Sequence, residues 1–250
     1  MTPFVNTGKL LCMITLHTAE ILISVITFFI AYIVVITVSN MFRTWVAYEM
    51  GDDTGMRLGY FTANPMVHID PIGLFFLFAF YFGWGRMVPI NPLLITQPHR
   101  SLKLAAAYLS DSFMHFVLSV IGIIALLAIF DVNILMVMRI MVLTYNVSHL
   151  PIANMYPDVS SLLVSIGFIV FAFVYLNVVL GVLTFIINFS NYLLFVFADR
   201  SYKIAQYAHY ITIGLPIFLI LFFSPLLRLL SVNLISYIGL IIAHFIGITG

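Results

Sequence analysis

The chain has 250 residues, of which 63% are hydrophobic and only 8% are charged. Water-soluble domains carry about one-quarter charged residues, so this composition excludes a soluble globular domain and predicts a membrane protein. The formal net charge of +1 provides no basic surface for nucleic acid, and we expect no nucleic-acid partner. Cys12 is the only cysteine, which excludes a disulfide framework and a cysteine-built metal site.

Long apolar runs predict an all-α polytopic membrane protein that forms one domain over residues 1–250. A helix rises 1.5 Å per residue and needs about 20 apolar residues to cross a hydrocarbon core of about 30 Å. About six such runs are present. The second is short, so it could either cross the membrane or enter and leave it on the same side. The predicted transmembrane helices are 10–50, 72–85, 104–130, 162–197, 205–223 and 226–246.

The segments between these runs are rich in turn formers. Residues 51–70 predict a small irregular or β-like loop region between the first two helices, because Gly, Asp, Asn and Pro interrupt every apolar stretch there. Three prolines make residues 86–103 a further connector. An apolar stretch around Arg139 predicts a helix that lies in the membrane interface.

Lys and Arg residues are distributed unevenly over alternate loops, which predicts how the chain is oriented. The richer side faces the cytoplasm or its topological equivalent. Both termini are then on the cytoplasmic or matrix side of a bacterial inner membrane, or of an organellar membrane such as the mitochondrial inner membrane. The lipid bilayer is the first expected partner. The basic residues of the richer side are Lys9, Arg86, Arg100, Lys103, Arg200 and Lys203, and those of the other side are Arg57, Arg139 and Arg228.

Residues 44–92 hold the most specific pattern in the chain. TWVAYEMGDDTG (44–55), LGYFTANPMVHIDPIG (58–73) and FGWGRMVPINP (82–92) follow one another in this order. Together they resemble the site-2 protease family of intramembrane zinc metalloproteases, in its small bacterial-type subgroup. The resemblance covers about a fifth of the chain and implies a site-2 protease-like core. The resemblance implies that the motif residues have a mostly structural role. They are Asn64, Pro65, His68, Asp70, Pro71, Gly73, Trp84, Pro89, Asn91 and Pro92.

The residues that carry the chemistry of that family are missing. The resemblance implies H-E-x-x-H on the helix before the WVAY segment, where two histidines bind zinc and the glutamate activates a water molecule. This chain has Ser39-Asn40-Met41-Phe42-Arg43 at those positions. The family's third ligand, an aspartate in a later motif, aligns with Tyr192. The arginine side chain has no lone pair to donate to a metal ion, and it places a positive charge where the metal would bind. We therefore expect no zinc and no other cofactor.

Arg43 is the strongest candidate for a functional residue. A charge within a transmembrane helix is costly and usually faces the interior of the helix bundle. In one interpretation the guanidinium fills the former metal position, paired with a carboxylate such as Asp70 or hydrogen-bonded to Asn40 and Tyr192. In the alternative, Arg43 lies near the helix end and extends to the membrane interface.

Two further polar pairs lie at helical spacing. Asp111 and His115 are four residues apart, and His17 and Glu20 are three apart. Asp111, His115 and His17 are the residues that a relocated metal site would use. Because a catalytic zinc needs three protein ligands and neither pair has a visible third, we interpret both pairs as structural.

Three functions remain open at this point. The first is a catalytically inactive, site-2 protease-like membrane protein that acts as a scaffold or as a subunit of a larger membrane complex, with other membrane proteins as partners. The second is an active intramembrane zinc metalloprotease with relocated ligands. The third is a transporter-like protein that moves protons through Glu20, Asp111 and His115.

Overall fold

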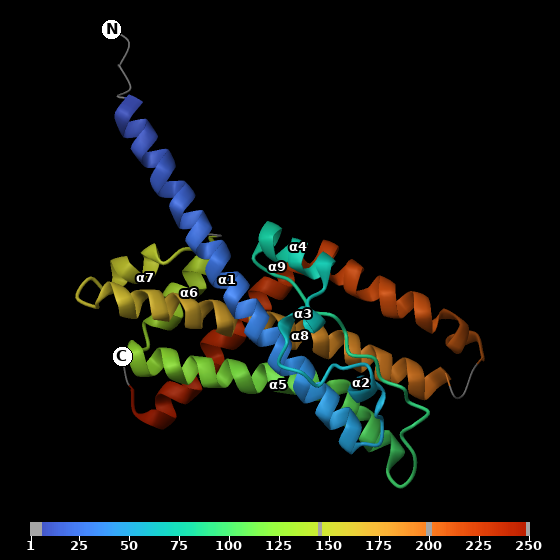
Figure 1. Cartoon of the computed structure of the whole chain (residues 1–250). Coiled ribbons are helices and arrows are strands. Elements are labelled where there is room, and N and C mark those ends of the chain that lie inside the picture. The colour runs from blue at the N-terminus through green and yellow to red at the C-terminus, as the bar shows by residue number, and fades with distance from the viewer. Residues whose placement is uncertain (1–6, 145–146, 199–201, 249–250) are drawn as a thin grey trace.

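A computed structural model gives the architecture of the chain (Figure 1). It describes the backbone of residues 7–144, 147–198 and 202–248, and the side chains of 18–144, 147–197, 218, 222 and 225–248. Within these residues all regular structure is helical, apart from an isolated antiparallel bridge between Ile69 and Gly85. The helices are α1 Thr7–Glu49, α2 Thr54–Arg57, α3 Pro65–His68, α4 Pro71–Phe80, α5 Arg100–Ile129, α6 Ile134–Leu143, α7 Leu150–Met155, α8 Ser161–Ala198 and α9 Tyr202–Ile246.

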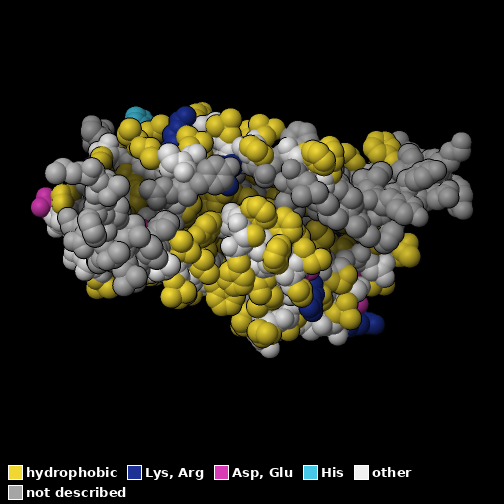
Figure 2. Space-filling view, turned by 90° about the horizontal axis from the view of Figure 1, so that it is seen from above, with side chains coloured by type: hydrophobic (Ala, Val, Ile, Leu, Met, Phe, Trp, Pro, Cys, Tyr) yellow, Lys and Arg dark blue, Asp and Glu magenta, His cyan; other side chains and the backbone are white. Residues whose placement is uncertain are grey.

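Four of the described helices are long and apolar enough to cross a membrane, which confirms the prediction of a polytopic membrane protein. These segments are Thr18–Glu49, Arg100–Ile129, Ser161–Phe197 and Pro225–Ile246. Figure 2 shows hydrophobic side chains over much of the face seen there, with Lys and Arg at only a few places. Exposed side chains such as Leu22, Phe113 and Leu162 give these helices surfaces suited to lipid.

The predicted count of six spans is not confirmed by the residues that the structure describes. The apolar run 72–85 is helical only up to the end of α4, whose ten residues extend about 15 Å and cannot cross the hydrocarbon core. Tyr81 ends this helix in the left-handed conformation. The runs 205–223 and 226–246 lie in one continuous helix, α9, because a proline such as Pro225 removes one hydrogen bond without ending a membrane helix.

Helix α8 is the centre of the bundle. It contacts α5, α9 and α1, and α1 crosses the layer formed by α5 and α8 (Figure 1). Apolar side chains of α8 such as Val174, Leu176 and Val178 are fully buried. Phe28 of α1 packs edge-on against Phe168 and Phe171 of α8. Because α8 packs against both α1 and α5, polar side chains on α8 can contact residues of both helices.

The loop region between α1 and α5 is built from two successive helix caps. Asn64 accepts a hydrogen bond from the Met66 amide at the start of α3, and Asp70 accepts from the amides of Ile72 and Gly73 at the start of α4. A proline follows each cap at the first helical position, where its missing N–H costs nothing. The N-P-x-x-H-I-D-P-x-G sequence thus encodes two short helices joined by two extended residues, Ile69 and Asp70.

Glycines let this loop region pack backbone against backbone. A Cβ on Gly73 would lie 1.9 Å from the carbonyl oxygen of Trp84, and a Cβ on Gly83 would lie 2.1 Å from that of Gly73. Tyr32 of α1 donates a hydrogen bond to the same Trp84 oxygen at 2.9 Å. The start of α4 and residues 83–85 are therefore held directly against α1, beside the middle of the bundle.

A second polar anchor lies outside the spans, where Tyr156 donates a hydrogen bond to Asp131. This bond, together with those from Asn133, lowers the pKa of Asp131. The folded-state pKa is below the unfolded value of about 3.9, so the stabilisation is present above that pH and is lost as pH falls through the folded pKa. We expect Tyr156→Phe to raise the pKa of Asp131, measured by NMR of its carboxyl carbon. An unchanged pKa would refute this role.

Candidate functional site

Three polar residues of α1 face the interior of the bundle at the place where the α1, α5 and α8 side chains converge. Ser39, Asn40 and Arg43 are 2%, 7% and 5% exposed, and their spacing of one and four residues puts them on one side of the helix. The Ser39 hydroxyl donates to the carbonyl of Val35 in its own helix. The Asn40 amide donates to the carbonyl of Arg86 at 2.9 Å and so ties α1 to the loop region.

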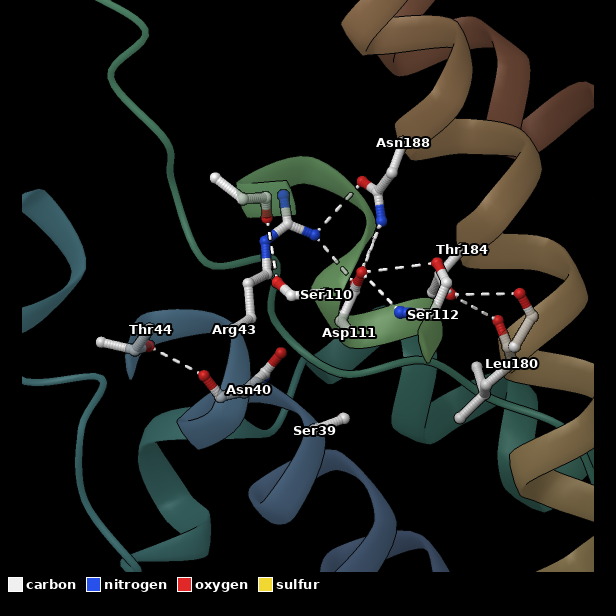
Figure 3. Close-up of polar contacts among 12 residues, drawn as sticks. Ser39, Asn40, Arg43, Thr44, Ser110, Asp111, Ser112, Leu180, Thr184 and Asn188 are labelled. Atoms are coloured by element: carbon white, nitrogen blue, oxygen red, sulfur yellow. Dashed lines mark hydrogen bonds and ion pairs between the residues drawn. The ribbon is translucent and has the colours of Figure 1, made fainter. Parts of the chain in front are cut away.

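Arg43 forms an ion pair with a residue of another transmembrane helix (Figure 3). Its Nη1 lies 2.8 Å from Oδ2 of Asp111 on α5 and 3.2 Å from Oδ1 of Asn188 on α8. The pair is buried, with 6% and 8% of the two side chains exposed. Extension of Arg43 to the membrane interface is therefore excluded.

Arg43 pairs with a carboxylate, as one interpretation of the sequence has it, but the residues named there are not its partners. Asp70 caps α4, because the amides at that helix start need an acceptor close by. The Asn40 side-chain amide donates a hydrogen bond to the Arg86 carbonyl and none to Arg43. Tyr192 lies one turn beyond Asn188 on α8 and packs in a small apolar cluster with Ala47, Ile95, Leu104 and Ala107.

The carboxylate of Asp111 is saturated with hydrogen bonds. Oδ1 accepts from the Ser112 amide and from Nδ2 of Asn188, both at 2.8 Å, and Oδ2 accepts from Nδ2 of Asn188 at 3.1 Å in addition to Arg43. A buried carboxylate needs such a shell, because an unpaired charge in the interior costs several kcal/mol. Asp111 thus has no free oxygen for a metal or for a reacting group.

His115 has partners different from those of Asp111, although the two residues are one turn apart on α5. Its Nδ1 lies 3.0 Å from Oδ1 of Asn177 on α8, and Asn177 donates to the carbonyl of Phe173. Between them, the Ser112 hydroxyl contacts that of Thr184 at 2.9 Å. The polar face of α5 is therefore matched, residue by residue, by a polar face of α8.

The structure does not bring His17 and Glu20 to this site. The side chain of His17 lies outside the described residues, but its backbone belongs to the continuous helix α1. It precedes Arg43 by 26 residues along this helix, about 39 Å. Glu20 is about 35 Å from Arg43 by the same measure. Glu20 is therefore too far along α1 to contact Asp111 or His115 directly.

The residues that the resemblance aligns with zinc ligands do not fit zinc. Ser39 directs its hydroxyl proton to the backbone, Arg43 places a positive charge there, and Tyr192 lies elsewhere. Tetrahedral zinc needs three or four nitrogen, sulfur or carboxylate ligands. Across the described part of the chain, no three His, Cys, Asp or Glu residues are grouped so that they could hold a metal ion.

A small cavity of about 50 Å³ remains between the three helices and the loop region. Apolar side chains of α1, α8 and the loop region form most of its wall, and the polar residues described above form the rest. Its lining includes Ile36, Asn40, Arg43, Arg86, Asp111, His115, Leu180, Leu183 and Asn188. This volume holds one or two water molecules or a small ligand.

The sequence interpretation missed Asn188 and Thr184, and placed no function on Asn177. These residues do carry a signal. They recur at spacings of seven and four residues in the otherwise apolar run of α8, which puts them on one helical face. A polar stripe in a transmembrane helix indicates contact with other polar groups of the bundle.

One stretch of the chain is similar to a named protein. It is 38% identical over 69 residues to "Putative zinc metalloprotease YwhC" of Bacillus subtilis (strain 168). The match covers 28% of this chain and 32% of the length of that protein. No protein-family model matches the chain, and no solved structure matches it. The similarity is thus local and supports a relation to a zinc metalloprotease over about a quarter of the sequence.

Proposed function

We propose that this chain is a catalytically inactive, site-2 protease-like membrane protein that acts as a scaffold or subunit of a larger membrane complex. Two features support the relation to that family: the motif order in residues 44–92 and the local similarity to a bacterial zinc metalloprotease. That similarity also supports a bacterial inner membrane as its location. The inactivity rests on a single observation, the buried Arg43–Asp111–Asn188 cluster.

Two features of this cluster, and a third of the neighbouring Asn40, argue against metal-dependent hydrolysis. Arg43 repels a divalent cation electrostatically at the place where the family's second histidine would lie. Asp111 could act as a ligand only if its hydrogen bonds to Arg43 and Asn188 were broken. Asn40, at the position of the catalytic glutamate, has an amide that cannot accept a proton from water near neutral pH.

The same cluster is well suited to holding helices together. It joins one buried residue from each of α1, α5 and α8 by charge-assisted hydrogen bonds. Beside it, an apolar groove of about 330 Å³ opens on the surface between α1 and α5, with Phe61 of the loop region at its edge. The groove is lined by Val38, Met41, Phe42, Trp45, Phe61 and Met114. We propose that a transmembrane helix of a partner subunit packs here.

Site-specific photo-crosslinking in the native membrane tests this function. A crosslinking amino acid at Trp45, which is 45% exposed in the groove, is expected to give one discrete protein adduct. The matched control is Tyr237 of α9, an exposed aromatic residue outside the groove, which should give mainly lipid adducts. Lipid adducts alone from both positions, or a partner recovered in cleaved form at Trp45, would contradict the proposal.

A further inference from the structure

A second cavity lies between the end of α4 and the helices around it. It has a volume of about 150 Å³ and shares no lining residue with the cavity beside Arg43. Its wall is formed by α1, α4, α6, α8, α9 and the segment between α6 and α7. More than half of the lining residues are aromatic: Phe28, Phe80, Tyr81, Phe171 and Tyr175.

The aromatic rings of this wall hold one another in place. Phe28 meets Tyr81 edge-on, with 5.2 Å between the ring centroids, and Phe171 stacks on Tyr175 at 6.2 Å. Such contacts fix the rings and keep the wall from closing over the cavity. Arg228, the charged residue of the lining, donates from Nη1 to the carbonyl oxygen of another lining residue at 3.3 Å. Most of the wall is therefore apolar and offers few hydrogen-bond partners to water.

The cavity is partly open, and its exposed lining residues are apolar. Phe80 is 55% exposed, and Ala79 beside it is exposed as well. Both lie at the end of α4, where Phe78 is also 48% exposed. In a membrane protein an exposed surface of this kind faces hydrocarbon. The acyl chains of the bilayer are thus the material that lies against the opening.

We propose that the end of a lipid acyl chain enters this cavity past Ala79 and Phe80 and packs against Phe28 and Phe171. Apolar cavities of about 150 Å³ take up molecules of the size of benzene, so about six carbon atoms of a chain fit. These atoms gain dispersion contacts with fixed rings on several sides, because a protein interior is packed more densely than a liquid. The headgroup stays at the membrane surface, since burial would remove its hydration. This site depends on the membrane location of the chain and not on the proposed scaffold function.

Photo-labelling of the full chain by lipids tests the site. The chain is placed in nanodiscs of phosphatidylcholine in which one acyl chain carries a diazirine at its methyl end. A second lipid carries the diazirine next to the glycerol, and adducts are mapped to residues by mass spectrometry. Phe28 and Phe171 are informative because they are 1% and 0% exposed, so lipid on the outer surface of the bundle does not reach them. Phe113 of α5, which is 60% exposed, measures the total labelling.

Two variants fill the cavity from different elements, so that the test does not depend on the folding of one of them. Ala79→Phe adds a ring at the opening, and Val147→Phe adds one from the segment between α6 and α7. The matched control is Ala128→Phe, because Ala128 is an exposed alanine of α5 outside the lining.

We expect the chain-end lipid to label Phe28 or Phe171 in the wild type and in Ala128→Phe, and this label to be lost from Ala79→Phe or Val147→Phe. Adducts at Phe113 should remain in all four chains. Three outcomes would overturn the proposal: no adduct at Phe28 or Phe171 in the wild type, undiminished adducts there in both filling variants, or equal labelling of these residues by the lipid with its diazirine next to the glycerol. None of these results changes the protein adduct expected at Trp45.

Discussion

Replacement of Arg43 with alanine is expected to lower the free energy of unfolding by about 3–5 kcal/mol, because it leaves Asp111 as an unpaired charge in the bundle. Asn188 alone cannot neutralise the carboxylate. Arg43→Lys should cost clearly less, since lysine keeps the charge but loses the fixed geometry of the guanidinium. The measurement is thermal or denaturant-induced unfolding of the purified chain in mild detergent, together with its level in the membrane.

Two controls separate loss of the ion pair from loss of packing. Arg139→Ala removes the same side chain at an exposed site on α6 and should change the stability by no more than about 0.5 kcal/mol. The double variant Arg43→Met with Asp111→Leu leaves neither charge alone, so it should cost less than the sum of its single changes. Equal stability of Arg43→Ala and Arg43→Lys would refute the role of the pair.

Gly73→Ala is expected to be the most damaging single-methyl change, at about 3 kcal/mol. The added Cβ would lie 1.9 Å from the Trp84 carbonyl oxygen, and backbone on both sides prevents the usual relief by a flexible side chain. The strain would separate α4 from residues 83–85. Protease accessibility of this loop region, compared with the unfolding of the whole chain, measures where the damage occurs.

Gly181→Ala is the matched control for this change. Gly181 lies within α8, where a Cβ would meet the Phe116 ring and the His115 Cβ at 3.2–3.3 Å. This contact needs only a small shift, and alanine gains about 1 kcal/mol of helix propensity over glycine. The variant should therefore stay near wild-type stability. If Gly73→Ala is as well tolerated as Gly181→Ala, the close backbone packing of the loop region is wrong.

Much of the architecture could be predicted from local sequence. Low charge and long apolar runs indicate membrane helices, and the caps at Asn64 and Asp70 depend on residues only two or three positions away. The 72–85 run was harder to interpret, because composition alone does not show that Tyr81 ends the helix. Hydropathy also does not show whether a proline such as Pro225 separates two spans or lies within one helix.

The partners in the candidate site depend on how distant helices align, which local patterns do not contain. Arg43 and Asp111 are 68 residues apart in sequence, and Arg43 and Asn188 are 145 apart. A rotation or a one-turn shift of α5 or α8 would change each pair. Burial of Arg43 could be predicted from the cost of a charge in a membrane, whereas the choice of Asp111 over Asp70 could not.

The zinc content of the purified chain tests the central claim most directly. The full chain would be extracted in mild detergent without chelator, and its metal-to-protein ratio would be measured by elemental analysis beside a chelator-washed sample. With Arg43 paired to Asp111 at the position that the resemblance assigns to a zinc ligand, the ratio should be far below one zinc per chain and should not change on chelation. A ratio near one, lost on chelation, would contradict the account and show that ligands converge elsewhere in the bundle.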